Sequence, residues 1–159
     1  MSIDQPALAW RLAHFMERYA RCIDNDELEA WPSFFDERCT YKVTTRDNLA
    51  QGYPFGLIYA DSRGMLEDRV KSLREANVYE GQRYRHLLGL PFVTGEDGEG
   101  IRVETSFLVM RIMRDGATST FATGCYRDRF LGVGELLSLT ERLVVCDSCR
   151  VDTLLAIPL

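Results

Sequence analysis

Histidine is scarce in this sequence, whose 159 residues include only His14 and His86. A mononuclear iron site of two histidines and one carboxylate would need both of them, but they lie in different predicted elements and lack ligand spacing. An iron–sulfur cluster held by two cysteines and two histidines needs all four ligands together, which this chain does not offer. We therefore expect no metal ligands, no cofactor-binding residues and no oxygen-activating centre in this chain alone.

Several other features are missing. No apolar stretch approaches the roughly 20 residues that span a bilayer, and the N-terminus lacks the pattern of a signal peptide, so we expect a cytoplasmic protein. Glycine-rich phosphate-binding patterns and the Gly-x-Ser-x-Gly elbow of hydrolases are absent. The net charge is −5, and neither sign gathers into runs, which predicts no nucleic-acid or membrane-surface partner.

The cysteines do not form a recognisable framework, because their number is odd and their spacing wide. They are Cys22, Cys39, Cys125, Cys146 and Cys149. The last two form a single Cys-x-x-Cys, but a closed zinc site needs two further ligands, and a thioredoxin-type motif precedes a helix rather than trailing a strand. We interpret all five as reduced structural thiols.

Length and patterning predict one domain over residues 1–159, large enough to build a core without disulfides or metal. A first amphipathic helix follows a cap at Ser2 or Asp4. Its apolar stripe consists of Leu8, Leu12, Phe15, Tyr19 and Cys22. A short second helix is expected from Asp26 to about Phe35, with Pro32 inside it. A third begins at Asp61 or Ser62, with an inner stripe of Leu66, Val70 and Leu73.

Strands dominate the rest of the chain, where the apolar period changes to two. We predict one strand at 40–45 and four consecutive strands at about 84–90, 101–114, 118–131 and 136–145, with a tight turn at Asp115 and Gly116. Helices followed by a strand meander predict an α+β fold, with the helices on one face of a curved antiparallel sheet. Leu108, Met110 and Ile112 make the second face apolar at its centre, which predicts that something covers it.

Few side chains suggest chemistry of their own. His86 ends the run Arg83-Tyr84-Arg85-His86, where basic and aromatic groups suit recognition of a carboxylate or contact with a partner. His14 lies in the first helix and is interpreted as a packing or partly exposed residue. Carboxylates such as Asp61, Asp128 and Asp147, or the phenols of Tyr41 and Tyr126, are able in principle to act as acid or base, but their spacing singles none of them out.

Residues along most of the chain nevertheless follow a known order. They are Asp24, Trp31, Phe34, Phe35, Cys39, Tyr41 and Val43; then Asp61, Met65, Leu66, Arg69 and Val70; then Arg83, Arg85 and His86; then Phe107, Val109, Arg111, Phe121, Gly124, Tyr126 and Asp128. In this order the chain resembles the small (β) subunits of aromatic-ring-hydroxylating dioxygenases. The segments 31–35, 73–77, 83–86, 88–91 and 156–159 are most similar to members that act on terephthalate.

The resemblance implies a cone-shaped, cystatin-like α+β fold of the nuclear transport factor and ketosteroid isomerase type. It implies a non-catalytic subunit that supports assembly of a large (α) catalytic subunit, which holds a Rieske [2Fe-2S] cluster and a mononuclear iron. In that family three small subunits form a trimer within a three-plus-three assembly. The residues we expect at subunit contacts are Arg69, Arg83, Arg85, His86 and Arg111.

The alternative is a free-standing isomerase or dehydratase of the same cone fold, with His86, Asp128 or Tyr41 as its acid or base. The two hypotheses differ in what they predict for the cone. An enzyme needs an open apolar cavity with an acid or base at its floor, whereas a structural subunit should have its cavity closed by aromatic side chains.

Overall fold

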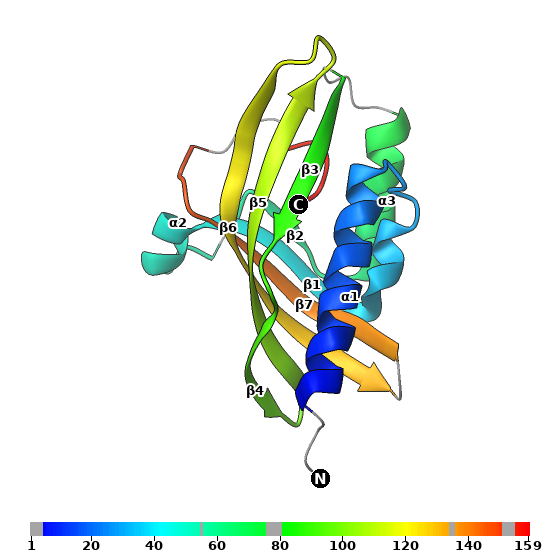
Figure 1. The fold of residues 1–159 in the computed structure, drawn as a ribbon, viewed down its shortest axis with the longest axis vertical. Coiled ribbons are helices and arrows are strands. Elements are labelled where there is room, and N and C mark those ends of the chain that lie inside the picture. Colours follow the sequence, from blue (N-terminus) through cyan, green and yellow to red (C-terminus); the bar gives the residue numbers. More distant parts are fainter. Residues whose placement is uncertain (1–4, 55, 76–80, 134–135, 151–154) are drawn as a thin grey trace.

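The computed structural model describes residues 5–54, 56–75, 81–133, 136–150 and 155–159. Two long helices pack against one face of a curved sheet (Figure 1). The elements in chain order are α1 (Gln5–Asp24), the 3-10 helix η1 (Trp31–Phe34), β1 (Phe35–Thr45), α2 (Arg46–Ala50), β2 (Ile58–Ala60), α3 (Arg63–Glu75), β3 (Gln82–Leu88), β4 (Phe92–Asp97), β5 (Gly100–Met113), β6 (Thr118–Val133) and β7 (Leu136–Cys146). The α+β class that the sequence predicts is confirmed.

The sheet is mixed rather than wholly antiparallel, which corrects the prediction. Its strand order is β2-β1-β7-β6-β5-β3, and β4 pairs with the same edge of β5 as β3 does. Strands β1 and β7 run parallel to each other, with Thr40 opposite Glu141 and Thr45 opposite Cys146. A parallel pair needs a long crossover connection. Here the chain runs through α3 and the antiparallel strands before β7 returns beside β1, so the first long strand of the sheet lies next to the last one.

Helices α1 and α3 confirm the predicted apolar stripes. Leu12 and Tyr19 of α1, and Leu66 of α3, are at most 1% exposed, because their spacing places them on the face toward the sheet. Ser62 caps α3, since its hydroxyl accepts a hydrogen bond from the backbone N–H of Met65 at 3.3 Å. The predicted cap of α1 at Ser2 or Asp4 lies outside the described residues.

The second helix expected from Asp26 is wrong. Asp26 adopts a positive φ of 59°, so the chain turns there instead of starting a helix. A single 3-10 turn, η1, follows, and Pro32 near its start has no backbone N–H to continue a longer helix. The indole Nε1 of Trp31 donates to the Tyr19 hydroxyl at 2.9 Å, which fixes this turn on α1.

Two short elements, α2 and β4, were missed. The helix α2 is capped by Thr45, whose hydroxyl accepts from the backbone N–H of Asn48 at 3.2 Å, but it has only five residues. Strand β2 has three residues, and β4 lies on the sheet's edge with an irregularity between Val93 and Gly95. Segments this short carry too little periodicity to be recognised, whereas the long strands at 101–114, 118–131 and 136–145 are confirmed as β5, β6 and β7.

The strongest side-chain bonds of the core surround Arg142 of β7, which is 0% exposed. Its Nε and Nη2 donate to the two carboxylate oxygens of Asp128 on β6, both at 2.8 Å. The guanidinium carbon lies 4.1 Å from the ring centroids of Tyr19 and Tyr126, between α1 and β6. One cation therefore joins the main helix to two neighbouring strands.

Among the described residues, no helix combines the length and the apolar character that crossing a bilayer requires.

Replacing Asp128 by alanine is expected to lower the free energy of unfolding by about 3–5 kcal/mol, because Arg142 would remain buried without its counter-charge. Urea denaturation followed by circular dichroism measures this change. Glu104→Ala is the control, since Glu104 forms an exposed pair with Arg127 at 3.8 Å between β5 and β6, and its loss should cost less than about 1 kcal/mol. Equal losses in both variants would contradict the assignment of Arg142 and Asp128 as a core pair.

Candidate functional site

Aromatic side chains and the segment 155–159 fill most of the inside of the cone, and a pocket of about 770 Å³ is left where Asp24, Tyr84 and Ile157 meet. Tyr41 of β1 is buried, and its ring meets those of Trp31 and Phe35 edge-on at centroid distances of 5.3 and 5.9 Å. The hydroxyls of Tyr19 and Tyr41 both donate to the carbonyl oxygen of Leu159, at 2.8 and 2.9 Å. Burial raises the pKa of Tyr41 well above its usual value, so the phenol stays protonated and acts as a hydrogen-bond donor.

A second polar pair joins the C-terminal end of α1 to β3. The Nδ1 of His86 lies 2.6 Å from Oδ1 of Asp24, and the backbone N–H of His86 donates to Oδ2 of Asp24 at 2.9 Å. The His86 side chain is 0% exposed and that of Asp24 5% exposed. The other ring nitrogen of His86, Nε2, is buried and has no hydrogen-bond partner among the described residues. Asp24 therefore orients the imidazole with one nitrogen turned inward.

Asp128 is committed to Arg142 rather than to a pocket. Burial raises the pKa of its carboxyl, and the two hydrogen bonds from the guanidinium counteract that shift. The three residues of the acid–base alternative are thus each bonded to a different partner: His86 to Asp24, Asp128 to Arg142 and Tyr41 to Leu159. In the described part of the chain no hydrogen bond joins these three residues to one another, so they do not form one catalytic cluster.

Metal-binding donors do not converge. Among the described residues, no group of three or more histidine, cysteine, aspartate or glutamate side chains is arranged to hold a metal ion. His14 is exposed on α1 and its ring is 6.1 Å from that of Trp10, whereas His86 is buried and bonded to Asp24. The arrangement of the two described histidines fits neither a two-histidine iron site nor a cluster site.

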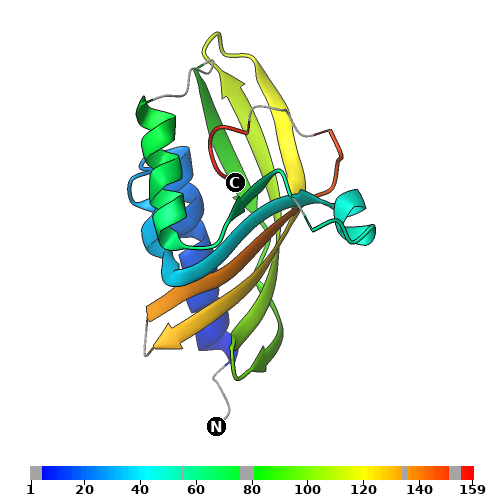
Figure 2. The same cartoon turned by 180° about the vertical axis from the view of Figure 1, so that it is seen from behind.

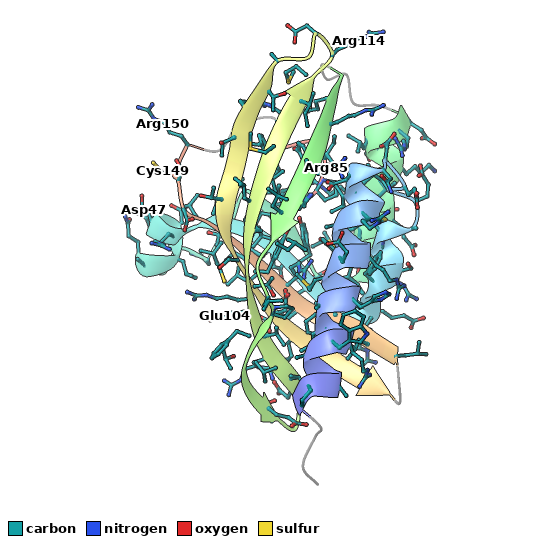
Figure 3. The ribbon with its side chains drawn as sticks, viewed as in Figure 1. Asp47, Arg85, Glu104, Arg114, Cys149 and Arg150 are labelled. Atoms are coloured by element: carbon teal, nitrogen blue, oxygen red, sulfur yellow. The ribbon has the colours of Figure 1, made fainter. Side chains whose placement is uncertain are left out.

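The Cys-x-x-Cys pair is split between core and surface. Burial raises the pKa of the Cys146 thiol to about 11, so this cysteine is a poor nucleophile. Cys149 is exposed and lies on the side of the molecule where α2 projects, near the labelled Asp47 (Figure 3). Burial likewise raises the pKa values of Cys22 and Cys39 to about 11.

The five residues expected at subunit contacts differ in exposure: two are exposed, two are half-buried and one is buried. Arg83 and Arg85 of β3 are exposed, because the alternation of the strand turns them away from the helices. His86 points the opposite way, into the core. Arg69 of α3 is half-buried and donates to the carbonyl of Leu155 at 3.1 Å, and the half-buried Arg111 of β5 lies 5.1 Å above the Phe121 ring.

The outer face of the sheet carries large apolar side chains that are exposed to solvent. We define the outer patch as Leu87, Leu108, Met110, Ile112 and Phe92. Leu87 is 57% exposed and Phe92 70% exposed, while the three residues of β5 are half-buried. Register places Leu87 opposite Leu108 and Phe92 opposite Glu104, which projects away from α1 in Figure 3. This patch is the apolar second face that the sequence predicts.

Comparison with known proteins identifies the family. The family described as "Ring hydroxylating beta subunit" matches residues 18–153. This chain belongs to the ring-hydroxylating β-subunit family. It is therefore a component of a ring-hydroxylating dioxygenase, and the resemblance predicted from the sequence is confirmed.

Individual relatives align over nearly the whole β subunit. The terephthalate 1,2-dioxygenase terminal oxygenase component subunit beta 1 of Comamonas sp. is 48% identical over 149 residues, covering 94% of this chain and 97% of that protein. The anthranilate 1,2-dioxygenase small subunit of Burkholderia cepacia is 39% identical, covering 89% and 88%. The crystal structure of the β subunit of a putative aromatic-ring-hydroxylating dioxygenase from Novosphingobium aromaticivorans superimposes with a TM-score of 0.89 at 37% identity, covering 98% and 99%.

Two parts of the site were missed from the sequence. Asp24 belongs to the residues that carry the resemblance, but its bond to His86 joins residues 62 positions apart and has no local signal. Arg142 was also missed, although a basic residue directly before the apolar run Leu143–Val145 was an available signal. An irregularity in the β6–β7 pairing beside Thr140 shifts the alternation so that Arg142 points inward.

Replacing Asp24 by alanine is expected to lower the free energy of unfolding by about 1.5–3 kcal/mol, because the His86 backbone N–H and ring nitrogen would lose their buried acceptor. Glu29→Ala is the control, since Glu29 bonds Arg74 at 2.7 Å with 66% of its side chain exposed and should cost at most about 1 kcal/mol. Urea denaturation of both variants measures the difference. A loss no larger for Asp24 than for Glu29 would rule out a structural role for the pair.

Proposed function

We propose that this β subunit is a non-catalytic assembly subunit that forms a trimer and supports a large catalytic α subunit in a three-plus-three complex. The observation that carries the proposal is the similarity to terminal oxygenase β subunits along nearly the whole chain. The interior supports it, because the candidate acid and base residues already form hydrogen bonds within the core. The α subunit would hold the Rieske cluster and the mononuclear iron.

The substrate of the complex would be an aromatic carboxylate, with terephthalate as the first to test. Two relatives named for aromatic carboxylates, terephthalate and anthranilate, support this class. The proposal assigns the substrate pocket to the α subunit, so the β subunit would influence turnover through the stability of its partner. We place the complex in the cytoplasm.

The contact surface proposed here is the outer patch together with Arg83 and Arg85. Arginine beside a partly desolvated apolar centre is typical of interface composition. Leu87 and Phe92 are exposed to an extent that leaves most of their surface available for a subunit contact. Arg69, Arg111 and His86 would act indirectly, by holding the sheet and the segment 155–159 in shape.

The purified chain is expected to form a trimer with no bound iron, and mixing it with the α subunit should raise the stability of that partner. At a free concentration one hundred times the dissociation constant, binding adds about 2.7 kcal/mol to the stability of a partner that only the folded state binds. Light scattering, metal analysis and thermal melting measure the three quantities. Stoichiometric iron or oxygen consumption in the chain alone would contradict the proposal.

Leu87→Asp tests the surface. It should weaken assembly by about tenfold to a hundredfold, because it places a charge where a leucine side chain would be buried, while the fold stays intact. Leu136→Asp is the matched control, since Leu136 is also a leucine on a strand and is 78% exposed but lies outside the outer patch. Analytical ultracentrifugation with and without the α subunit measures the effect, and equal behaviour of the two variants would exclude the outer patch.

The family match makes this chain a dioxygenase component, so the free-standing isomerase or dehydratase is not proposed; the buried pair of Asp24 and His86 is the feature that would suit it. An imidazole held by a carboxylate with its other nitrogen unpaired suits a general base. Turnover of a cone-fold enzyme would be lost in His86→Ala, whereas an assembly subunit with that substitution would lose stability only.

A further inference from the structure

The segment Leu155–Leu159 lies inside the cone without belonging to the sheet. It has no helix or strand assignment, and it curls between α3 and the strands β3 to β6 (Figure 2). Leu155, Ile157 and Leu159 are at most 8% exposed, so the segment forms part of the core rather than of the surface.

Side chains of four elements supply the hydrogen bonds of this segment. The bonds run from Arg69 Nη2 to the carbonyl of Leu155 at 3.1 Å, from the Tyr84 hydroxyl to the carbonyl of Ile157 at 3.5 Å, and from the hydroxyls of Tyr19 and Tyr41 to the carbonyl of Leu159 at 2.8 and 2.9 Å. The backbone N–H of Leu159 donates to the Tyr41 hydroxyl at 3.1 Å. Buried backbone is more often paired with other backbone, as in a helix or a sheet.

The donors have anchors of their own that do not involve the segment. The hydroxyl of Tyr19 accepts from the Trp31 indole at 2.9 Å, and its ring lies on the Arg142 guanidinium. Tyr41 packs edge-on against Trp31, and Tyr84 stacks on Phe121 at 4.9 Å. These groups would therefore keep their positions if the segment left, which is the property of a preorganised site.

Unpaired polar atoms line the same interior. The hydroxyl of Tyr126 and Nη1 of Arg142 are buried, and no hydrogen bond reaches either atom within the described part of the chain. The Tyr126 ring lies 6.3 Å from that of Tyr19, next to the hydroxyl that holds Leu159. Buried groups of this kind cost free energy unless a ligand or a water satisfies them.

We propose that the interior of the cone is a binding site for a short apolar peptide with carbonyl acceptors at alternate residues, occupied in cis by Leu155–Leu159. Apolar burial of three side chains gives the site its affinity, and the tyrosine hydroxyls at Leu159 give it direction. The site does not depend on the outer patch, so it stands apart from the proposed subunit contacts.

A variant that lacks residues 155–159 tests the proposal with the peptide acetyl-Leu-Ala-Ile-Pro-Leu-carboxylate as the probe. The truncated chain should bind one peptide saturably and regain the melting temperature of the intact chain, measured by calorimetry and thermal denaturation. The intact chain should bind none at the same concentrations, because its site is filled. A peptide with aspartate in place of isoleucine should not bind.

Substitutions in the truncated chain locate the site. Tyr41→Phe should weaken peptide binding by about threefold to tenfold, because one buried hydroxyl bonds both the carbonyl and the N–H of the last residue. Tyr59→Phe is the control, since Tyr59 is 56% exposed and lies on the outward side of β2; it should leave binding unchanged.

Three results would overturn the proposal. One is a truncated chain that is folded but does not bind the peptide at millimolar concentration. Another is an intact chain that binds the peptide as tightly as the truncated chain does. The third is a truncated chain that is unfolded and stays unfolded when peptide is added, since a ligand that binds the folded state must promote folding. Restored circular dichroism on adding the peptide would instead support it.

Discussion

A single buried cation organises the interior of this β subunit. Arg142 is fully buried, so its charge must be balanced where it stands. Asp128 supplies the balance from the next strand, and the rings of Tyr19 and Tyr126 cover the two faces of the guanidinium. Because Tyr19 also bonds Trp31 and Leu159, the position of this charge fixes how α1, η1 and the last segment meet the sheet. These elements must be placed accurately around Arg142 because a charge in the low-dielectric interior needs partners at fixed positions. The helix or strand propensity of a single element does not set that requirement.

Sequence patterns predicted the parts of the fold whose signals are local and long. The stripe from Leu8 to Cys22 predicted α1 because it repeats over about four turns, and the period of two predicted β5, β6 and β7. The parallel pairing of β1 with β7 was not predictable, since it joins Thr40 to Glu141 across most of the chain. For the site the limit was the same: the bond between Asp24 and His86 is a product of tertiary packing, and only the family resemblance had singled out both residues.

The two faces of the sheet have different physical states. Most of the inner face is covered, because helices, aromatic rings and the segment Leu155–Leu159 pack on it, with a pocket left beside Asp24, Tyr84 and Ile157. On the outer face Leu87 and Phe92 remain largely open to water, beside exposed Arg83 and Arg85. Leaving large apolar side chains in water forgoes stabilisation that a second surface would provide, on the order of 25 cal/mol for each Å² covered. A packed interior together with exposed apolar side chains on the outer face is what we expect of a subunit that assembles with partners.

Buried polar side chains often indicate catalysis, but their bonds decide what they do. A phenol that donates to the Leu159 carbonyl, or an aspartate that holds a guanidinium with two hydrogen bonds, cannot accept a substrate proton without breaking those contacts. His86 differs, because Asp24 occupies one ring nitrogen and leaves the other unpaired. In a cone whose interior were empty, the same pair would face a substrate. Here the apolar segment Leu155–Leu159 lies in that interior. What occupies the cone, a substrate or a segment of the chain, is therefore the feature that separates an enzyme of this fold from an assembly subunit.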